Sequence, residues 1–227
     1  MKVSVIGLGY IGLPTAAILA SKKVEVLGVD TSQNIVDSIK LGQIHIIEPH
    51  LSDLVFSTVK KGYLRSSIKP ESADIFMIAV PTPFKGNNEP DLSFIENAAK
   101  SIAPVIKKGN MVILESTSPV GATEKMMSWM QELRPDLIFP TFGGDGSLAD
   151  ISIAYCPERV LPGQVVRELV ENDRIIGGVT SYCAEKAIKL YKIFVKAECL
   201  VTDCRTAELS KLVENSFRDV NIAFANE

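Results

Sequence analysis

The sequence predicts an α/β fold, with a doubly wound, mostly parallel sheet followed by the start of a long helix. Short apolar runs alternate with helix-like segments along most of the 227 residues, a pattern typical of βαβ units with helices on both faces of a sheet. The first apolar run leads through a glycine-rich turn directly into a helix, which is the connection that parallel strands require. The segment from Arg205 to Glu227 has one continuous helical pattern and supplies the long helix.

The composition fits a protein with a sizeable core. Hydrophobic residues make up 46% and charged residues 22% of the chain, which excludes a disordered chain. The length suits one large domain or one domain plus part of another. Lys and Arg number 24 and Asp and Glu 27, giving a net charge of −3. Without runs of like charge, this balance argues against a nucleic-acid or anionic-membrane partner.

Neither the cysteines nor the apolar amino terminus indicates export. The cysteines form no C-x-x-C pair, and with only two histidines in the chain they predict neither a disulfide framework nor a metal site. The stretch from Val3 to Ala20 contains Gly7, Gly9 and Gly12, so it is too short and too glycine-rich to span a bilayer. We therefore expect a soluble, reduced, cytoplasmic protein.

The first elements follow from local residue patterns. Val3–Ile6 is an apolar run that ends at a glycine, which predicts a buried strand. The segment Ile11–Ser21 is rich in Ala, Ile and Leu and predicts a helix, with Pro14 in the first turn, where a missing N–H costs least. The next predicted strand, Val24–Val29, ends at Asp30.

Two helices come next. Ser32 is a candidate cap for a helix that runs to Lys40 and is closed by Gly42. An amphipathic helix follows over Ser52–Lys61 and ends at Gly62.

The alternation then repeats with shorter elements. The predicted strands are Ile75–Val80, Met111–Leu114, Ile151–Tyr155, Arg174–Ile176 and Cys199–Val201. The predicted helices are Leu92–Lys107, Ala122–Leu133, Val165–Val170 and Tyr182–Val195. Pro104 is expected to bend or interrupt the first of these helices, and Pro135 stops the second. The glycines at 143, 144 and 146 predict a surface loop.

The last predicted helix, Arg205–Glu227, has Thr202 or Asp203 as its cap. One face is apolar and consists of Leu209, Val213, Phe217, Val220 and Phe224. Residues roughly opposite include Lys211, Asn215 and Arg218. The helix ends without a glycine, a proline or a basic last turn, and its apolar face has no obvious partner. We therefore expect a chain cut in mid-helix; the alternative is a surface helix that simply ends the protein.

The motif GLGYIG fits G-x-G-x-x-G and lies between the first strand and the first helix. In that context it predicts a dinucleotide site and a Rossmann-like fold. Gly7 would permit the tight turn, Gly9 the close approach of the backbone to a pyrophosphate, and Gly12 the packing of the helix on the sheet. The helix N-terminus would offer its N–H groups to the phosphates, and Tyr10 and Ile11 complete the set expected at the cofactor.

Asp30 is placed to accept hydrogen bonds from a ribose and to repel a 2′-phosphate. Since no arginine follows it, we expect NAD rather than NADP. Two loops, VPTP and ESTSPVG, follow later strands at the same edge of the predicted sheet. Their Thr82 and Thr117 are candidates for hydrogen bonds to the cofactor; otherwise the Pro, Ser and Thr residues only shape turns.

Six features occur in order along the chain: GLGYIGLP, Asp30, VPTP, ESTSPVG, CPERVLPG and the helix from Ala207. Together they resemble the nucleotide-sugar 6-dehydrogenases of the UDP-glucose/GDP-mannose dehydrogenase superfamily. CPERVLPG and VPTPFKGNNEPD are more similar to members that act on UDP-N-acetyl-D-mannosamine than to those that act on UDP-glucose. The resemblance implies that two NAD oxidise the C6 hydroxyl of a UDP-sugar to a carboxylate, a four-electron reaction that supplies surface-polysaccharide precursors. It also implies that the full-length enzyme is a homodimer.

The resemblance assigns roles to individual residues. Lys211, in the pattern A-E-x-x-K-L-x-x-N, matches a catalytic lysine that moves protons and stabilises an oxyanion, and Asn215 lies one turn further on. Glu158 resembles a glutamate with an acid/base role near the hydrolytic water. The residues expected at the substrate are Arg159, Val160, Lys211, Asn215 and Arg218. Without the resemblance, the helix residues would be a solvated polar face and Glu158 and Arg159 a surface ion pair.

One part of the family pattern is missing. The second oxidation in that family uses a cysteine nucleophile that forms a thiohemiacetal and then a thioester, in a motif G-x-G-G-x-C that this sequence lacks. We expect each cysteine here to be a buried small hydrophobe. The expected organisation is an NAD-binding Rossmann-like domain over residues 1–203 and the beginning of a central connecting and dimerisation helix over 204–227, without the C-terminal UDP-sugar domain. Such a chain would bind NAD but not complete catalysis.

Three other functions stay open. The chain could belong to a UDP-glucose 6-dehydrogenase, or be a non-catalytic NAD-binding module that acts as a sensor. It could also belong to a two-electron β-hydroxyacid or sugar-phosphate dehydrogenase of similar architecture.

Overall fold

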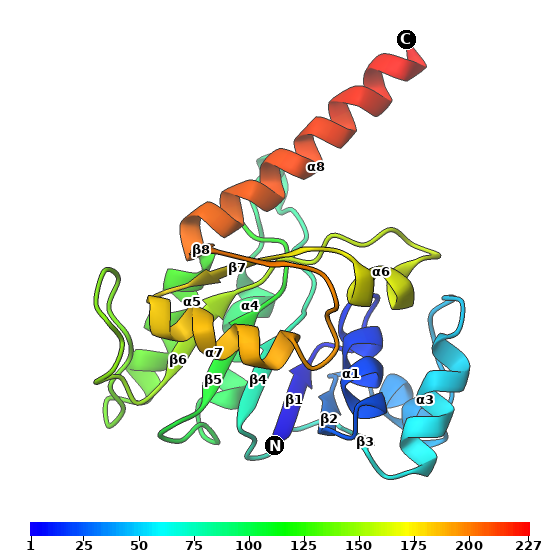
Figure 1. Ribbon diagram of the computed structural model, residues 1–227, viewed down its shortest axis with the longest axis horizontal. Coiled ribbons are helices and arrows are strands. Elements are labelled where there is room, and N and C mark those ends of the chain that lie inside the picture. The colour runs from blue at the N-terminus through cyan, green and yellow to red at the C-terminus, as the bar shows by residue number, and fades with distance from the viewer.

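The computed structural model describes residues 1–227 and has three layers, with helices on both faces of a single sheet (Figure 1). The eight strands lie in the order β3-β2-β1-β4-β5-β6-β7-β8. Only the β6–β7 pair is antiparallel. The strands are β1 (Lys2–Ile6), β2 (Glu25–Val29), β3 (Leu64–Ser67), β4 (Ile75–Ile78), β5 (Met111–Leu114), β6 (Ser152–Tyr155), β7 (Arg174–Gly178) and β8 (Cys199–Asp203). This is the doubly wound, mostly parallel α/β fold that the alternation pattern predicts.

The two faces of the sheet carry separate apolar clusters. One cluster packs against α1 (Gly12–Ser21), α3 (Leu51–Lys60), α6 (Val165–Glu171) and α7 (Ser181–Tyr191). The other packs against α4 (Ser93–Ile102), α5 (Ala122–Leu133) and the first turns of α8 (Cys204–Asn226). The helix α2 (Gln33–Lys40) lies along β3, and a 3₁₀ turn, η1 (Gly86–Asn88), precedes α4. Because β1, β2, β4, β5 and β6 are mutually parallel, the loops at their carboxyl ends meet at one edge of the sheet.

The strand β3 is the one strand that the alternation pattern does not predict. Its sequence, LRSS, has a single large apolar residue, so it lacks the β-branched or aromatic run that identifies a strand. It forms because Leu64 and Ser66 both face inward at the sheet edge beside β2. The Ser66 hydroxyl donates to the Val36 carbonyl oxygen at 2.8 Å, which satisfies a polar group in a buried position.

Three helix predictions need correction. The helix predicted over Tyr182–Val195 runs over Ser181–Tyr191. The helix predicted over Leu92–Lys107 ends at Ile102, since Pro104 cannot donate the next backbone hydrogen bond. The side chain of Ser32 occupies the N-cap position of α2 without making a capping hydrogen bond. Instead, the Ser32 N–H donates to Asp30 Oδ1 at 2.9 Å, so the turn before α2 is held by the aspartate.

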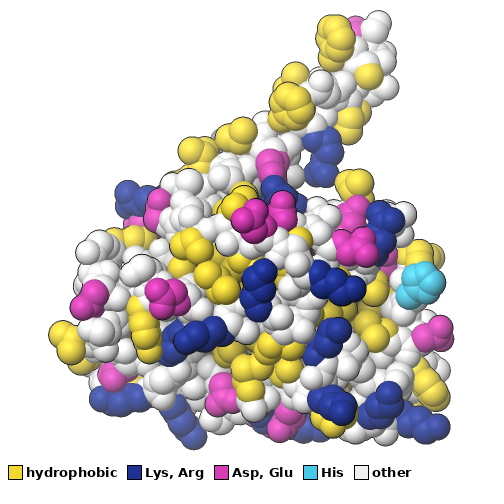
Figure 2. Space-filling view, in the orientation of Figure 1, with side chains coloured by type: hydrophobic (Ala, Val, Ile, Leu, Met, Phe, Trp, Pro, Cys, Tyr) yellow, Lys and Arg dark blue, Asp and Glu magenta, His cyan; other side chains and the backbone are white.

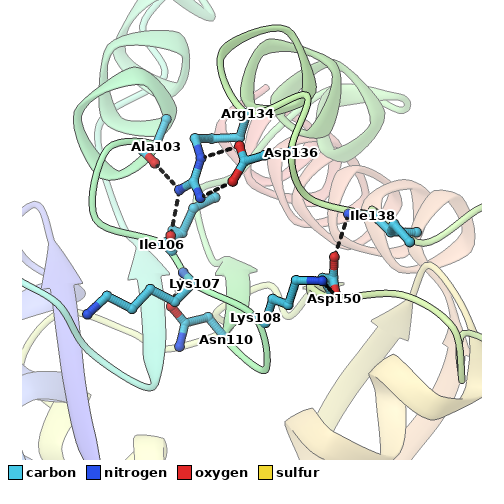
Figure 3. A network of polar contacts seen from close by, with 9 residues as sticks. All are labelled: Ala103, Ile106, Lys107, Lys108, Asn110, Arg134, Asp136, Ile138 and Asp150. Carbon is cyan, nitrogen blue, oxygen red and sulfur yellow. Dashed lines mark hydrogen bonds and ion pairs between the residues drawn. The ribbon is translucent and has the colours of Figure 1, made fainter.

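A polar network joins the ends of α4 and α5 (Figure 3). Arg134 follows α5, and its Nη1 donates to the carbonyl oxygens of Ala103 and Ile106 at 2.9 and 2.5 Å. These carbonyls lie past the end of α4, where no helical N–H remains to pair with them. Asp136 binds the same guanidinium through both carboxylate oxygens. Arg134 therefore supplies donors to two carbonyl oxygens beyond the end of α4.

The helix α8 projects from the body of the protein (Figure 1). Its first two turns are anchored, because Cys204, Ala207, Glu208 and Lys211 are buried. Asp203 caps the helix and accepts a hydrogen bond from the Thr206 N–H at 2.9 Å, as one of the two caps considered for this helix. The rest of α8 is exposed, with apolar side chains along it (Figure 2). No helix of the chain combines the length and apolarity needed to cross a bilayer.

Candidate functional site

A cavity of about 840 Å³ lies at the carboxyl ends of the parallel strands. It is lined by the glycine-rich turn after β1, by Asp30 after β2, and by loop residues that follow β4, β5 and β6. Lys211 of α8 also reaches this cavity. The cavity therefore collects residues from both ends of the sequence at one edge of the sheet, where open α/β sheets bind their ligands.

The glycine-rich turn has no room for side chains at two of its glycines. Gly7 has φ +93°, and a Cβ there would lie 2.6 Å from the Ala79 carbonyl oxygen, so both its conformation and its surroundings require glycine. A Cβ on Gly12 would lie 1.8 Å from the Gly7 carbonyl oxygen. A Cβ on Gly9, by contrast, would meet nothing within 4 Å, because Gly9 borders the cavity.

The turn that leads into α1 offers unpaired backbone donors to this cavity. The N–H groups of Gly9, Tyr10, Ile11 and Gly12 make no hydrogen bond within the protein. Such donors at a helix N-terminus, together with the helix dipole, form a site for phosphate groups. The bare backbone at Gly9 and the volume of the cavity also fit a dinucleotide.

Asp30 supports the glycine-rich turn as well as bordering the cavity. Its Oδ2 accepts a hydrogen bond from the Leu8 N–H at 2.9 Å, and its Oδ1 accepts one from Ser32. Each carboxylate oxygen has two lone pairs, so Asp30 keeps acceptor capacity for ribose hydroxyls. The role as an acceptor for a ribose was predicted from the sequence, whereas the hydrogen bond that supports the glycine-rich turn was not.

Thr82 and Thr117 lie between two cavities. Both line the 840 Å³ cavity and also a second cavity of about 710 Å³. The Thr82 hydroxyl donates to the Thr117 carbonyl oxygen, and the Ser116 hydroxyl donates to the Val80 carbonyl oxygen at 2.7 Å. These bonds connect the VPTP and ESTSPVG loops to each other, so a ligand that contacts one loop contacts a rigid pair.

The structure brings Lys211 and Glu158 together in the first cavity. Lys211 is 8% exposed, and its Nζ donates to the Glu158 carbonyl oxygen. Burial lowers the pKa of Lys211 below its ordinary value, although the nearby carboxylate of Glu158 opposes this shift. A lowered pKa increases the fraction of neutral amine near neutral pH, which is the form that accepts a proton.

The carboxylate of Glu158 pairs with Arg174 rather than with its neighbour Arg159. Arg174 Nη1 donates to Glu158 Oε2, with both side chains buried, and the Arg159 N–H donates to Glu158 Oε1 at 2.9 Å. Arg159 itself forms an ion pair with Glu214 of α8. A surface pair between Glu158 and Arg159, which the sequence alone would suggest, is therefore not formed.

The other residues expected at the substrate fall into separate places. Val160 lines the first cavity, whereas Asn215 and Arg218 line the second. Arg218 Nη2 donates to Asn215 Oδ1 at 3.1 Å. Arg159 lines neither of the two cavities. Lys211 and the pair Asn215–Arg218 thus lie on opposite sides of the boundary formed by Thr82 and Thr117.

Glu115 is a cavity residue that was not singled out from the sequence. It follows β5 directly, is 2% exposed and lines the first cavity. Its Oε1 accepts a hydrogen bond from the Tyr191 hydroxyl at 2.7 Å, whereas its Oε2 is buried without a hydrogen-bond partner. The only sequence signal was an acidic residue at the end of an apolar strand, inside the ESTSPVG motif.

None of the four cysteines lines either cavity. Cys156, Cys183 and Cys204 are buried, and burial raises the pKa of the Cys156 thiol well above its ordinary value. A thiol with a raised pKa is a poor nucleophile. Cys199 is only partly buried, because it starts the edge strand β8, so the expectation of full burial is wrong for this residue.

Comparisons with known proteins agree with this architecture. Residues 1–195 match the family model described as "UDP-glucose/GDP-mannose dehydrogenase family, NAD binding domain". The UDP-N-acetyl-D-mannosamine dehydrogenase of Campylobacter jejuni is 67% identical over 227 residues, which is 100% of this chain and 55% of that protein. An NDP-N-acetyl-D-galactosaminuronic acid dehydrogenase of Ralstonia nicotianae is 63% identical over 99% of this chain and 53% of its own.

Among solved structures, a UDP-D-ManNAc dehydrogenase from Pyrococcus horikoshii superposes with a TM-score of 0.92 at 42% identity. The alignment covers 100% of this chain and 52% of that one. The chain therefore spans about half the length of the curated relatives and of the solved structure that it matches.

Proposed function

This chain belongs to the UDP-glucose/GDP-mannose dehydrogenase family, and from this premise we propose that it is the NAD-binding part of a UDP-N-acetyl-D-mannosamine 6-dehydrogenase. The whole enzyme would oxidise the C6 hydroxyl of the UDP-sugar to a carboxylate, removing four electrons. The relative from Campylobacter jejuni bears that name at 67% identity. In the proposed organisation, residues 1–203 bind NAD and residues 204–227 begin a helix that connects to the sugar-binding part.

The observation that supports the proposal most strongly is the composition of the first cavity. It combines a turn with free N–H groups, suited to a pyrophosphate, with a buried lysine and a buried glutamate from distant parts of the sequence. NAD, when bound, supplies the hydride acceptor for both oxidations. The chain itself supplies the groups that hold it, namely the turn at Gly7, Gly9 and Gly12, and Asp30.

The proton chemistry would be carried by Lys211 and Glu158. The amine of Lys211, whose pKa is lowered by burial, would accept the proton of the C6 hydroxyl and stabilise negative charge on the oxygen. Glu158, fixed by Arg174 and by the Arg159 N–H, would orient the water that later hydrolyses the activated acid. Asn215 and Arg218 would contact the sugar nucleotide from the second cavity.

The second oxidation would need a thiol from outside this chain. No cysteine lines either cavity, and the relatives are about twice as long as the matched segment. We therefore expect the chain alone to bind NAD without sustained turnover. The whole enzyme would also be a homodimer, paired through its central helix.

A substrate panel tests the proposal. The chain, and the same chain joined to the remaining half of a matched relative, are incubated with NAD and UDP-N-acetyl-D-mannosamine, and NADH is followed by absorbance. We expect steady NADH formation, with two NADH per uronic acid, only from the joined protein. Steady formation of the uronic acid by the chain alone would contradict the missing-thiol proposal, and no turnover by the joined, folded protein would contradict the assigned reaction.

A second candidate substrate is UDP-N-acetyl-D-galactosamine. It is favoured by the relative from Ralstonia nicotianae, which is named as an N-acetyl-D-galactosaminuronic acid dehydrogenase and is 63% identical to this chain. Including this sugar and UDP-glucose in the panel separates the candidates, because the proposed substrate should give the highest kcat/KM of the three.

A further inference from the structure

The sheet order places the two halves of a bound dinucleotide at different strands. The pyrophosphate site follows β1, and the ribose acceptor Asp30 follows β2 on one side of it. The other half of the coenzyme must then extend the opposite way, past β4 towards the tips of β5 and β6. Glu115 follows β5 and Glu158 lies in the loop after β6, so this end of the cavity contains two buried carboxyl groups.

At that end of the cavity, Glu115 has a buried carboxylate oxygen without a hydrogen-bond donor. Its Oε2 is buried with no donor, while its Oε1 is held by Tyr191 of α7. The charged groups around it are Arg174 of β7, which already pairs with Glu158, and the Glu158 carboxylate itself. The thiol of Cys156, after β6, is the remaining titratable neighbour. A buried carboxylate left short of partners is stabilised by any positive charge that enters the cavity.

We propose that Glu115 makes the cavity distinguish the oxidised from the reduced coenzyme, because its carboxylate attracts the positively charged nicotinamide ring of NAD⁺ and gains nothing from the neutral ring of NADH. The inference rests on the proposed function, in which this chain binds NAD. It deepens that function, because a reaction that uses two NAD per sugar requires NADH to leave and NAD⁺ to enter between the two oxidations. Glu115 would favour that exchange.

Proton linkage gives the inference a measurable consequence. Burial raises the pKa of Glu115 to about 7, with the Arg174 guanidinium acting in the opposite direction. The group is therefore partly protonated near neutral pH, and only its ionised form attracts the oxidised ring. Binding of NAD⁺ must then favour loss of the proton, and a rise in pH must favour binding of NAD⁺ by the same factor.

The test is calorimetric titration of the chain with NAD⁺ and with NADH between about pH 6 and about pH 8, repeated in two buffers of different ionisation enthalpy. We expect the ratio Kd(NADH)/Kd(NAD⁺) to rise roughly tenfold over this range. We also expect net proton release on NAD⁺ binding and none on NADH binding. In Glu115→Gln both effects should disappear, and in the surface control Glu124→Gln, which loses only an exposed pair with Arg205, both should remain.

A second variant tests the inference without removing the carboxyl group. The Tyr191 hydroxyl lowers the pKa of Glu115 by its hydrogen bond, so Tyr191→Phe should move the midpoint of the pH dependence to higher pH. A ratio independent of pH in the native chain, or an unchanged slope in folded Glu115→Gln, would overturn the inference. Absence of heat with both coenzymes at every pH would instead contradict the proposed function on which the inference rests.

Discussion

Gly9 and Gly12 lie in the same turn, but each is required for a different reason. The Cβ of a residue at position 12 would overlap the Gly7 carbonyl oxygen, whereas a Cβ at position 9 would project into free space. Gly12 is needed for the fold, whereas we propose that Gly9 is needed for the ligand.

These two glycines give the first prediction. Gly12→Ala should lower the free energy of unfolding by about 3 kcal/mol, the upper range for overpacking, measured by urea denaturation. Gly9→Ala should change it by less than about 0.5 kcal/mol yet weaken NAD binding at least roughly tenfold, because the methyl group occupies the cradle for the pyrophosphate. Native affinity for NAD in folded Gly9→Ala would show that the phosphates bind elsewhere.

Glu115 gives a prediction about stability and pH. Its pKa is raised from its ordinary 4.5 to about 7 by burial, so the folded protein binds this proton more tightly than the unfolded chain does. The stabilisation is therefore complete below about pH 4.5 and is lost as the pH rises through about 7, an effect on the order of 3 kcal/mol. The Tm of Glu115→Gln minus the Tm of the native chain should therefore increase as the pH rises from about 5 to about 8. A difference in Tm that stays constant over this range would contradict the raised pKa.

Site residues that are local in sequence could be predicted from their spacing, and Lys211 and Glu158 were named only through the family resemblance. Contacts between residues far apart in the sequence could not be predicted. Gly7, Gly9 and Asp30 belong to one βαβ unit, whose geometry is fixed by residue spacing. The bond between Tyr191 and Glu115 joins residues 76 apart in the sequence, and no spacing rule predicts such a contact. The motif that contains Glu115 was recognised, but its carboxylate became a candidate only once its buried position was known.

At the scale of elements, a glutamate of α8 caps α5. Glu208 is fully buried, and its Oε2 accepts a hydrogen bond from the Gly121 N–H at 2.6 Å. Its Oε1 accepts from the Thr123 N–H and hydroxyl at 2.8 and 2.6 Å. A carboxylate from another helix thus satisfies the free donors of α5 and complements its dipole. The contact fixes the first turns of α8 to the end of the ESTSPVG loop.

This cap gives the third prediction. Glu208→Gln should lower the free energy of unfolding by about 2 to 3 kcal/mol, because the amide offers one acceptor oxygen and places its NH₂ against buried donors. Substitution of the partly exposed neighbour Glu124, in the variant Glu124→Gln, should cost less than about 1 kcal/mol. The two variants are compared by urea denaturation. Equal small effects would mean that Glu208 does not hold α5.

The elements themselves were predictable wherever their pattern is strong. The bounds of β5 and α5 agree with the prediction to the residue, because an apolar run between breakers and an amphipathic segment before a proline leave little choice. The strand β3 is different, since LRSS becomes a strand only through its pairing with β2. Tertiary contacts, not local preference, decide such edge strands.

At the scale of the whole molecule, the projecting part of α8 exposes an apolar face (Figure 2). Phe217 is 72% and Phe224 82% exposed, and Val213 and Val220 are also exposed along the same helix. A contiguous apolar surface of this kind on an isolated chain favours self-association. The face was predicted from the sequence, and its lack of contacts within the chain agrees with that prediction.

The fourth prediction concerns this face. The native chain should self-associate at micromolar concentration, and the double variant Phe217→Ser/Phe224→Ser should be monomeric with an unchanged Tm, because neither ring packs in the core. Sedimentation velocity measures the association, and thermal unfolding provides the control. A native chain that stays monomeric at all concentrations would contradict the role assigned to this face.

The fifth prediction tests the central claim, that the turn after β1 and Asp30 form an NAD site, by calorimetric titration of the folded chain with NAD and NADP. We expect saturable heat with NAD, weaker binding of NADP, and at least roughly tenfold weaker NAD binding in Asp30→Ala, with no loss in the exposed control Asp37→Ala. Folded chain that gives no heat with NAD, or an Asp30→Ala variant with native affinity, would contradict the account.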